Sequence, residues 1–130
     1  MSRTPTALLT DQSVGATAAA VSNSTKTAFG ASTSLFSLYA KLTNGNGVVN
    51  PQNTVRVYAA VSQFSLTTAE APLQLGKLAV VLEIKPNLLS GGVTQEKIEL
   101  QAADGAYLYT WTMEPKLDAA ATLSLTLVEM

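Results

Sequence analysis

Alternation of apolar and polar residues with a period of two constrains this sequence more than any other feature. Successive side chains of a β-strand point to opposite faces, so this period predicts strands with one face in a core. The stretches that carry the alternation are residues 34–43, 54–62, 78–85, 97–101, 106–113 and 122–129. No amphipathic helix competes with them, and residues 73–82 or 117–121 leave room for a helical turn at most.

Turn-forming residues separate these stretches, as a meandering all-β chain requires. They are Asn44–Gly47, Asn50–Asn53, Lys85–Asn87, Ser90–Gly92, Asp104–Gly105 and Glu114–Lys116. Asp-Gly between two alternating runs is typical of a tight hairpin. We therefore expect residues 97–102 and 106–113 to pair as antiparallel neighbours. Residues 15–34 are almost all small, and we expect short strands there as well.

These signals predict an all-β fold, either a β-sandwich or a jelly roll of about seven to eight antiparallel strands with no substantial helix. A length of 130 residues suits one domain. We assign residues 1–10 to an N-terminal arm and residues 11–130 to the single sandwich domain. The expected core residues are Phe36, Leu38, Leu42, Val55, Val57, Val61, Val80, Leu82, Ile84, Ile98, Leu100, Leu123, Leu125 and Leu127.

The chain contains neither cysteine nor histidine. This excludes disulfides, Ser-His-Asp and Cys-His machinery, and the usual zinc sites. Glu96 and Glu99 are three positions apart in an expected strand, so they point to opposite faces and do not form an acid–base pair. Asp104, Asp118 and Asn87 could offer oxygen ligands to calcium, although turn formation explains them equally well. We expect no catalytic residue, no metal and no cofactor.

Charged residues are sparse, at 13% of the chain, against about 25% in a typical soluble domain. Either part of the surface is covered in an assembly, or the surface is polar without charge. Arg3 and Arg56 are the only arginines and no basic stripe exists, so nucleic-acid binding is not expected. No apolar run approaches the roughly 20 residues that span a bilayer, so no membrane partner is expected. The first ten residues lack a secretory signal, and we expect the protein to stay in a cytoplasm until it assembles.

Tyr107, Tyr109 and Trp111 share one face of an expected strand. An exposed face of this kind would be a sugar-stacking platform. We favour a core position, because the opposite face, with Leu108 and Thr110, could not fill a core alone.

The N-terminal arm is the expected interaction element. Its candidate contact residues are Ser2, Arg3, Thr4, Pro5, Thr6, Ala7, Leu8 and Leu9. Residues 2–5 lack apolar anchors and Pro5 favours an extended path, so we expect a neighbouring chain to hold the arm. Loops at one end of the sandwich would add to this contact. The alternative is that Leu8 and Leu9 begin a strand of the domain's own sheet.

Two parts of the sequence, SLYAKLTNG at 37–45 with VRVYAAVS at 55–62, and GAYLYTW at 105–111 with ATLSLTLVEM at 121–130, resemble small β-sandwich virion proteins of tailed bacteriophages. The resemblance spans most of residues 33–130 and rests on composition and strand layout, without a diagnostic motif. It includes capsid decoration (cement) proteins, which bridge shell subunits. It implies a non-enzymatic virion component that is assembled in the host cytoplasm. Its partners would be the major capsid protein or other virion proteins, and copies of itself, with a trimer favoured. A head–tail connector, tail or spike component is an alternative, and a carbohydrate-binding module is an alternative of another class.

Overall fold

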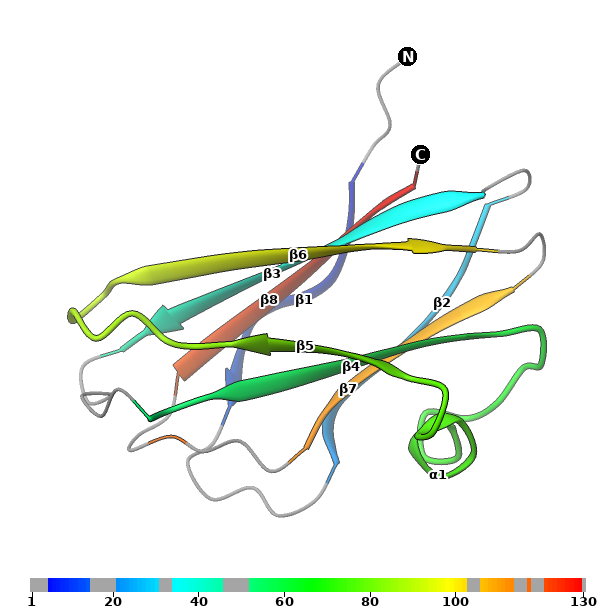
Figure 1. Cartoon of the computed structure of the whole chain (residues 1–130), viewed down its shortest axis with the longest axis horizontal. Helices are drawn as coiled ribbons and strands as arrows, with labels where there is room; N and C mark the ends of the chain where they lie inside the picture. The colour runs from blue at the N-terminus through cyan, green and yellow to red at the C-terminus, as the bar shows by residue number, and fades with distance from the viewer. Residues whose placement is uncertain are drawn as a thin grey trace.

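The computed structural model describes residues 5–14, 21–30, 34–45, 52–102, 106–113, 117 and 121–129, and these form a β-sandwich (Figure 1). The strands are β1 Thr6–Val14, β2 Ser22–Ala28, β3 Leu35–Asn44, β4 Val55–Ser62, β5 Val80–Ile84, β6 Val93–Gln101, β7 Tyr107–Thr112 and β8 Ala121–Glu129. The helix α1, Ala71–Leu75, is too short to cross a membrane, and the described residues form no other α-helix. The expected all-β class with about eight strands is confirmed.

The two sheets have the strand order of a jelly roll. Sheet A runs β1-β8-β3-β6, sheet B runs β2-β7-β4-β5, and all neighbours are antiparallel. Strand β1 therefore pairs with β8, β2 with β7, β3 with β6 and β4 with β5, as when one long hairpin is rolled around a barrel. The jelly roll is the form of sandwich that the chain adopts.

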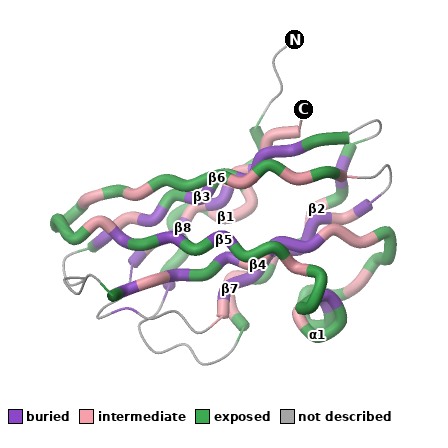
Figure 2. The backbone as a smooth tube through the Cα atoms, viewed as in Figure 1, coloured by how far each residue is buried: buried purple, intermediate pink, exposed green. Residues whose placement is uncertain are grey.

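The main core lies between the inner faces of the sheets (Figure 2). Ten of the expected core residues are buried, namely Phe36, Leu38, Leu42, Val55, Val57, Leu82, Ile84, Leu123, Leu125 and Leu127. Val61, Ile98 and Leu100 are half-buried and pack against this core. Burying one such Leu or Ile completely contributes about 1.5–3 kcal/mol, so these side chains dominate the stability of the sandwich.

Val80 was expected in the core, and this prediction is wrong. Its side chain is 40% exposed, although its strand neighbours Leu82 and Ile84 are buried. Strand β5 is an edge strand. Val80 is its first residue and follows the segment that contains α1, where the strand does not yet cover the core. The alternation correctly predicted which side chains of β5 face inward, but it did not show how far along the strand the opposing sheet extends.

The expected hairpin at Asp104–Gly105 is also wrong. Strands β6 and β7 follow one another in the chain, but β6 pairs with β3 in sheet A and β7 pairs with β2 and β4 in sheet B. The connection crosses between the sheets, and residues 103–105 themselves lie outside the described residues. A tight local turn was less favourable than pairing both edges of β7 and burying Leu108 in the main core.

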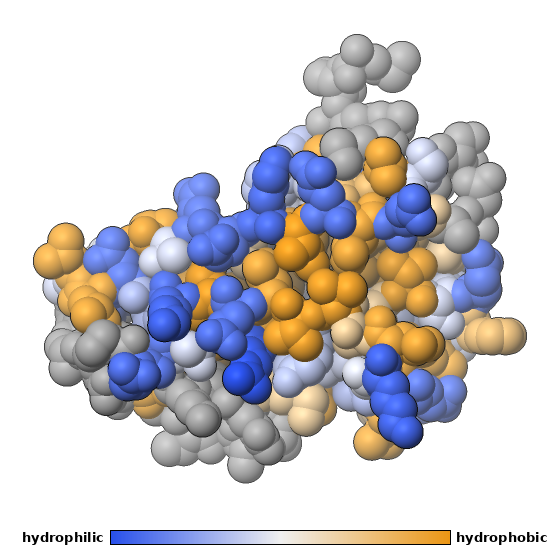
Figure 3. Space-filling view, viewed as in Figure 1, coloured by the Kyte–Doolittle hydropathy of each residue, from blue (hydrophilic) through white to orange (hydrophobic). Residues whose placement is uncertain are grey.

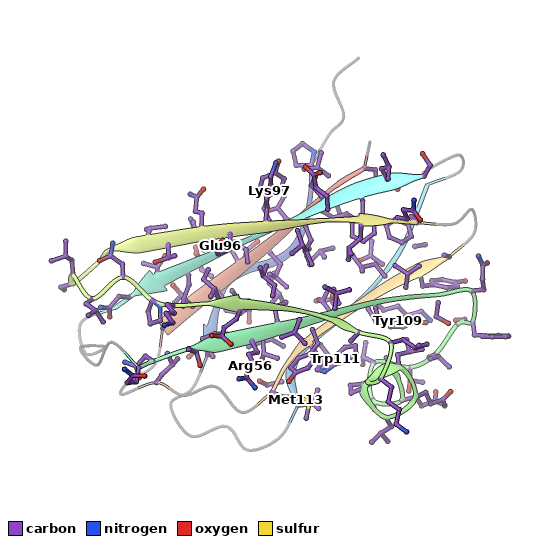
Figure 4. All side chains as sticks on the ribbon, viewed as in Figure 1. Arg56, Glu96, Lys97, Tyr109, Trp111 and Met113 are labelled. Atoms are coloured by element: carbon purple, nitrogen blue, oxygen red, sulfur yellow. The ribbon has the colours of Figure 1, made fainter. Side chains whose placement is uncertain are left out.

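Each edge of the sheets has a feature that opposes pairing with another strand. Strands β1 and β2 contain register shifts, with the backbone left-handed at Asp11 (φ 46°) and Asn23 (φ 54°). Strand β5 has only five residues. Strand β6 carries three charged residues. Two of them, Glu96 and Lys97, are adjacent in the sequence and point to opposite sides of the strand (Figure 4). Contacts with partners are therefore better served by loops and faces than by strand edges.

Candidate interaction surfaces

The arm residues named from the sequence divide between two regions. Ser2, Arg3 and Thr4 lie outside the described residues. Thr6, Ala7, Leu8 and Leu9 belong to β1, where Thr6 is opposite Leu127 and Ala7 is opposite Thr126. Leu8 and Leu9 are half-buried against the main core. The arm boundary at residue 10 is therefore corrected: these leucines attach the segment to its own domain, which is the alternative considered above.

The aromatic face of β7 is buried, but not in the main core. Tyr109 is fully buried and Trp111 is 1% exposed, in a second cluster with Ala60, Ala71 and Leu75 on the outer face of sheet B. The opposite face of β7, with Leu108, lines the main core. The expected core position is confirmed for Tyr109 and Trp111. The reason given for it is corrected, because the opposite face does line a core.

The cover over this aromatic face is the β4–β5 connection, residues 63–79, which contains α1 (Figure 4). The Tyr109 hydroxyl donates a hydrogen bond to the carbonyl of Phe64 (2.9 Å) and accepts one from the amide of Leu66 (2.6 Å). One buried phenol thus attaches the beginning of the connection to sheet B.

A capping box holds the next turn of the connection. The Thr67 amide donates to the Glu70 carboxylate (3.0 Å), and the Glu70 amide donates to the Thr67 hydroxyl (3.1 Å). Hydrogen bonds from the Thr67 backbone and side chain lower the pKa of Glu70 below its ordinary value. The Thr-x-x-Glu spacing at 67–70 is visible in the sequence and was the missed signal for a helix that begins near residue 70.

Three large apolar side chains of the β4–β5 connection are exposed to solvent. Phe64 is 75% exposed, Leu73 is 88% exposed and Leu78 is 71% exposed. We call these three residues the α1 tip. Exposed apolar side chains that gather on one ordered element are candidates for contact with a partner.

A second apolar tip lies at the other end of the long axis, on the turn between β5 and β6 (Figure 1). Leu88, Leu89 and Val93 are exposed there, with Leu89 at 73%, and we call them the β5–β6 tip. Figure 3 shows apolar atoms at both ends of this view and between the edge strands β5 and β6. The molecule therefore exposes apolar side chains at both ends, whereas the sequence predicted contact loops at one end only.

Buried Asn44 holds the β5–β6 tip. Its side-chain amide donates to the carbonyls of Asn87 (2.8 Å) and Leu89 (3.3 Å), and its backbone carbonyl accepts from Gly91 (2.9 Å). Gly91 has φ +73°, a conformation that favours glycine. The Asn87 carboxamide oxygen accepts from the Leu89 amide (2.9 Å), in agreement with a turn-forming role. Leu88 and Leu89 thus lie on a turn whose backbone is held by these hydrogen bonds.

The outer face of sheet A is polar and is hollowed around Tyr39, which is 41% exposed. The groove has a volume of about 360 Å³ and is lined by Pro5, Tyr39, Ala40, Lys41, Gln95, Ser124, Thr126 and Val128. Lys97 lies beside it, with Nζ 5.8 Å from the centre of the Tyr39 ring. Its hydrogen bond to Glu99 (3.2 Å) raises the pKa of Lys97, so the ammonium stays charged at neutral pH.

The described residues contain no group of three or more acidic side chains that could hold a metal ion. Glu99 is bonded to Lys97 on the outer face of β6, and Glu96 points to the other side.

No known protein family model matches this chain, and no curated protein matches it in sequence. The chain is similar in structure to exo-β-1,3-galactanase from Phanerochaete chrysosporium, solved with β-1,3-galactotriose (TM-score 0.49, 12% identity) and with galactose (TM-score 0.46, 13% identity). Each match covers 97% of this chain but only 26% of the galactanase chain. The chain is also similar to a chain of the native virion of Kashmir bee virus at acidic pH (TM-score 0.43, 13% identity), covering 98% of this chain and 71% of the other. These matches are likenesses of fold alone.

Proposed function

We propose that this protein is a non-enzymatic structural component of a virion, and specifically a decoration protein that bridges neighbouring subunits of a phage capsid. The observation that carries the proposal is the pair of apolar tips at opposite ends of one elongated jelly roll. A bridge needs a contact surface at each end, and it needs both ends to be held rigidly relative to one another.

The sandwich supplies that rigidity. Tyr109 and the capping box attach the α1 tip to sheet B, and Asn44 attaches the β5–β6 tip to the end of β3. A contact surface that is ordered before binding loses less conformational entropy on association. Exposed leucines on such supports favour tight contact with apolar pockets of shell subunits.

The sparse charge of the chain supports the same role. With 13% charged residues, its surface is less charged than that of most soluble domains, and burial in an assembly accounts for this. A bridging protein stabilises the shell because it binds the assembled state and not the separated subunits. Its location would then be the virion, with assembly in the host cytoplasm.

The test uses capsids of the encoding phage that lack this protein. One variant carries Leu73→Ser and Leu78→Ser, a second carries Leu88→Ser and Leu89→Ser, and Lys77→Ser is the matched surface control. The wild type and the control should cosediment with capsids and raise the temperature at which the shells release DNA. Each tip variant should lose this stabilisation while the isolated domain keeps its melting temperature. The proposal fails if wild-type protein does not bind capsids, or if both tip variants stabilise them fully.

A further inference from the structure

We infer that the groove around Tyr39 is a saccharide-binding site for an oligosaccharide with at least one neutral hexose unit. This activity is separate from the bridging role, since it uses the outer face of sheet A and neither apolar tip. The sugar platform considered from the sequence was placed on β7, where Tyr109 and Trp111 are buried.

Tyr39 presents an exposed aromatic ring on the outer face of sheet A. Of the four tyrosines it is the only exposed one, since Tyr58 and Tyr107 are half-buried and Tyr109 is buried. It lies near the middle of β3, paired on one side with Thr126 of β8 and on the other with Lys97 of β6. The two central strands and the edge strand β6 hold this ring in place, and no described segment crosses over it as residues 63–79 cross over β7.

The second argument is the shape around the ring. Two adjoining hollows, of about 360 and 320 Å³, share Tyr39 and Gln95, and Glu96 and Lys97 complete the lining of the second. Together they run across β8, β3 and β6, and each is large enough for a hexose unit. A ring at the junction of two hollows can pack against the C–H face of one sugar while the next residue of the chain occupies the other hollow.

The third argument is the chemistry of the lining. A sugar hydroxyl both donates and accepts hydrogen bonds, and it binds well where both kinds of partner converge. Gln95 offers a carbonyl oxygen and an amide, Thr126 offers a hydroxyl, and Lys41 offers an ammonium, while the Ser124 hydroxyl is hydrogen-bonded to Asp11. Pro5 and Val128 add an apolar rim. This mixture of apolar surface with a few convergent polar groups is typical of a small-molecule site.

Lys97 does not oppose this use of the ring. Its ammonium is 3.2 Å from Glu99, and both side chains are about half exposed, at 52% and 59%. An exposed ion pair of this kind is weak and can rearrange. The Lys97 ammonium, 5.8 Å from the centre of the Tyr39 ring, can therefore swing away from the ring face when a sugar ring packs there.

The test begins with a glycan array that carries neutral and acidic oligosaccharides. The best neutral ligand is then titrated into ¹⁵N-labelled protein, and chemical shifts are followed on β3, β6 and β8. Tyr39→Ala should weaken binding by at least about tenfold, and Tyr39→Phe should retain most of it, because the ring face makes the contact. Gln95→Ala should weaken binding severalfold. Phe64→Ala removes a more exposed aromatic ring, 75% against 41% for Tyr39, from the α1 tip and should have no effect.

Melting temperatures of all variants should match the wild type, since these side chains are on the surface. The inference is overturned if no neutral oligosaccharide shifts residues of β3, β6 and β8, or if Tyr39→Ala binds as well as the wild type. It is also overturned if Phe64→Ala weakens binding as much as Tyr39→Ala, which would indicate nonspecific adhesion to aromatic surface. Binding only to acidic glycans, lost in high salt, would instead indicate attraction to lysines and would reject the site as described.

Discussion

The indole of Trp111 lies parallel to the ring of Tyr58 on the neighbouring strand, with their planes 3° apart and their centroids 5.7 Å apart. Trp111 is buried, and its Nε1 has no hydrogen-bond partner among the described residues. The pair forms the floor of the second core cluster, on which the β4–β5 connection rests. The position of the α1 tip therefore depends on this aromatic layer as well as on hydrogen bonds.

Truncating the indole should test that dependence. Trp111→Ala should destabilise the domain by about 3–5 kcal/mol, since a large cavity opens beneath α1. Trp111→Phe should cost less, because it keeps a ring against Tyr58 and removes a buried N–H that lacks a partner. Urea unfolding followed by far-UV circular dichroism suits both variants, since each lacks the only tryptophan. Equal losses would mean that a phenyl ring at this position stabilises the cluster no better than a methyl group.

The Tyr109 hydroxyl should matter locally. Tyr109→Phe removes the donor to the Phe64 carbonyl and the acceptor of the Leu66 amide, and should cost about 1–3 kcal/mol. Hydrogen exchange at the Leu66 amide should accelerate more than exchange within β3. Tyr39→Phe, which removes an exposed hydroxyl, is the control. Unchanged protection at Leu66 in the Tyr109 variant would show that α1 docks by apolar packing alone.

Acid should loosen α1 before it unfolds the sandwich. The pKa of Glu70 is lowered in the folded state by its hydrogen bonds with Thr67. Its carboxylate therefore contributes stability above the unfolded-state pKa, and that contribution is lost as the pH falls through the lower folded value. Amide shifts of residues 67–75, followed by NMR from about pH 6 to about pH 2, should report this step. Glu70→Gln should remove the step, and its persistence would assign it to another group.

Asn44 should control the β5–β6 tip. Asn44→Ala leaves the carbonyls of Asn87 and Leu89 without their buried donor, and should cost about 1–3 kcal/mol. The variant should also lose capsid stabilisation, as the Leu88 and Leu89 variant does. Lys85→Ala, at an exposed position next to the same turn, should change stability by no more than about 0.5 kcal/mol. Capsid stabilisation that survives Asn44→Ala would show that the tip does not need a rigid turn.

The inward face of the strands can be tested with two apolar residues. Leu125→Ala should cost about 2–5 kcal/mol, because this fully buried side chain sits between β1 and β3. Val80→Ala should cost less than about 1 kcal/mol, because Val80 is 40% exposed on an edge. Urea midpoints that rank the two variants in the opposite order would refute the burial assigned to β5.

The sequence predicted most of the strands well, because a strand that buries one side alternates with period two; β7 buries both of its sides and is the exception. Leu123, Leu125 and Leu127 are buried as the alternation required. It predicted strand partners poorly, since the pairing of β6 and β7 is decided by sheets that assemble from distant segments. Asp104–Gly105 favours a hairpin locally, but the closure of both sheets outweighs a local turn.

The surfaces were harder to predict than the core. Leu73 and Leu78 lie near a predicted core stretch, and only the position of α1 shows that they point to water. Strand β7 is apolar on both faces, and no pattern along the chain distinguishes a second covered layer from an exposed platform. The groove around Tyr39 is built by three strands that are far apart in sequence, so no local pattern in the sequence marks it.

The jelly-roll order also determines when this chain can fold. Strands β7 and β8 come last in the sequence, yet β8 lies between β1 and β3, and β7 lies between β2 and β4. Until they have left the ribosome, β1 and β2 have no sheet partners, and the inner faces of both sheets stay open to solvent. Such nonlocal closure is slow and leaves apolar strands exposed while translation continues. Synthesis that stops before Tyr107 would therefore release a chain prone to aggregation, because both sheets are completed only by β7 and β8.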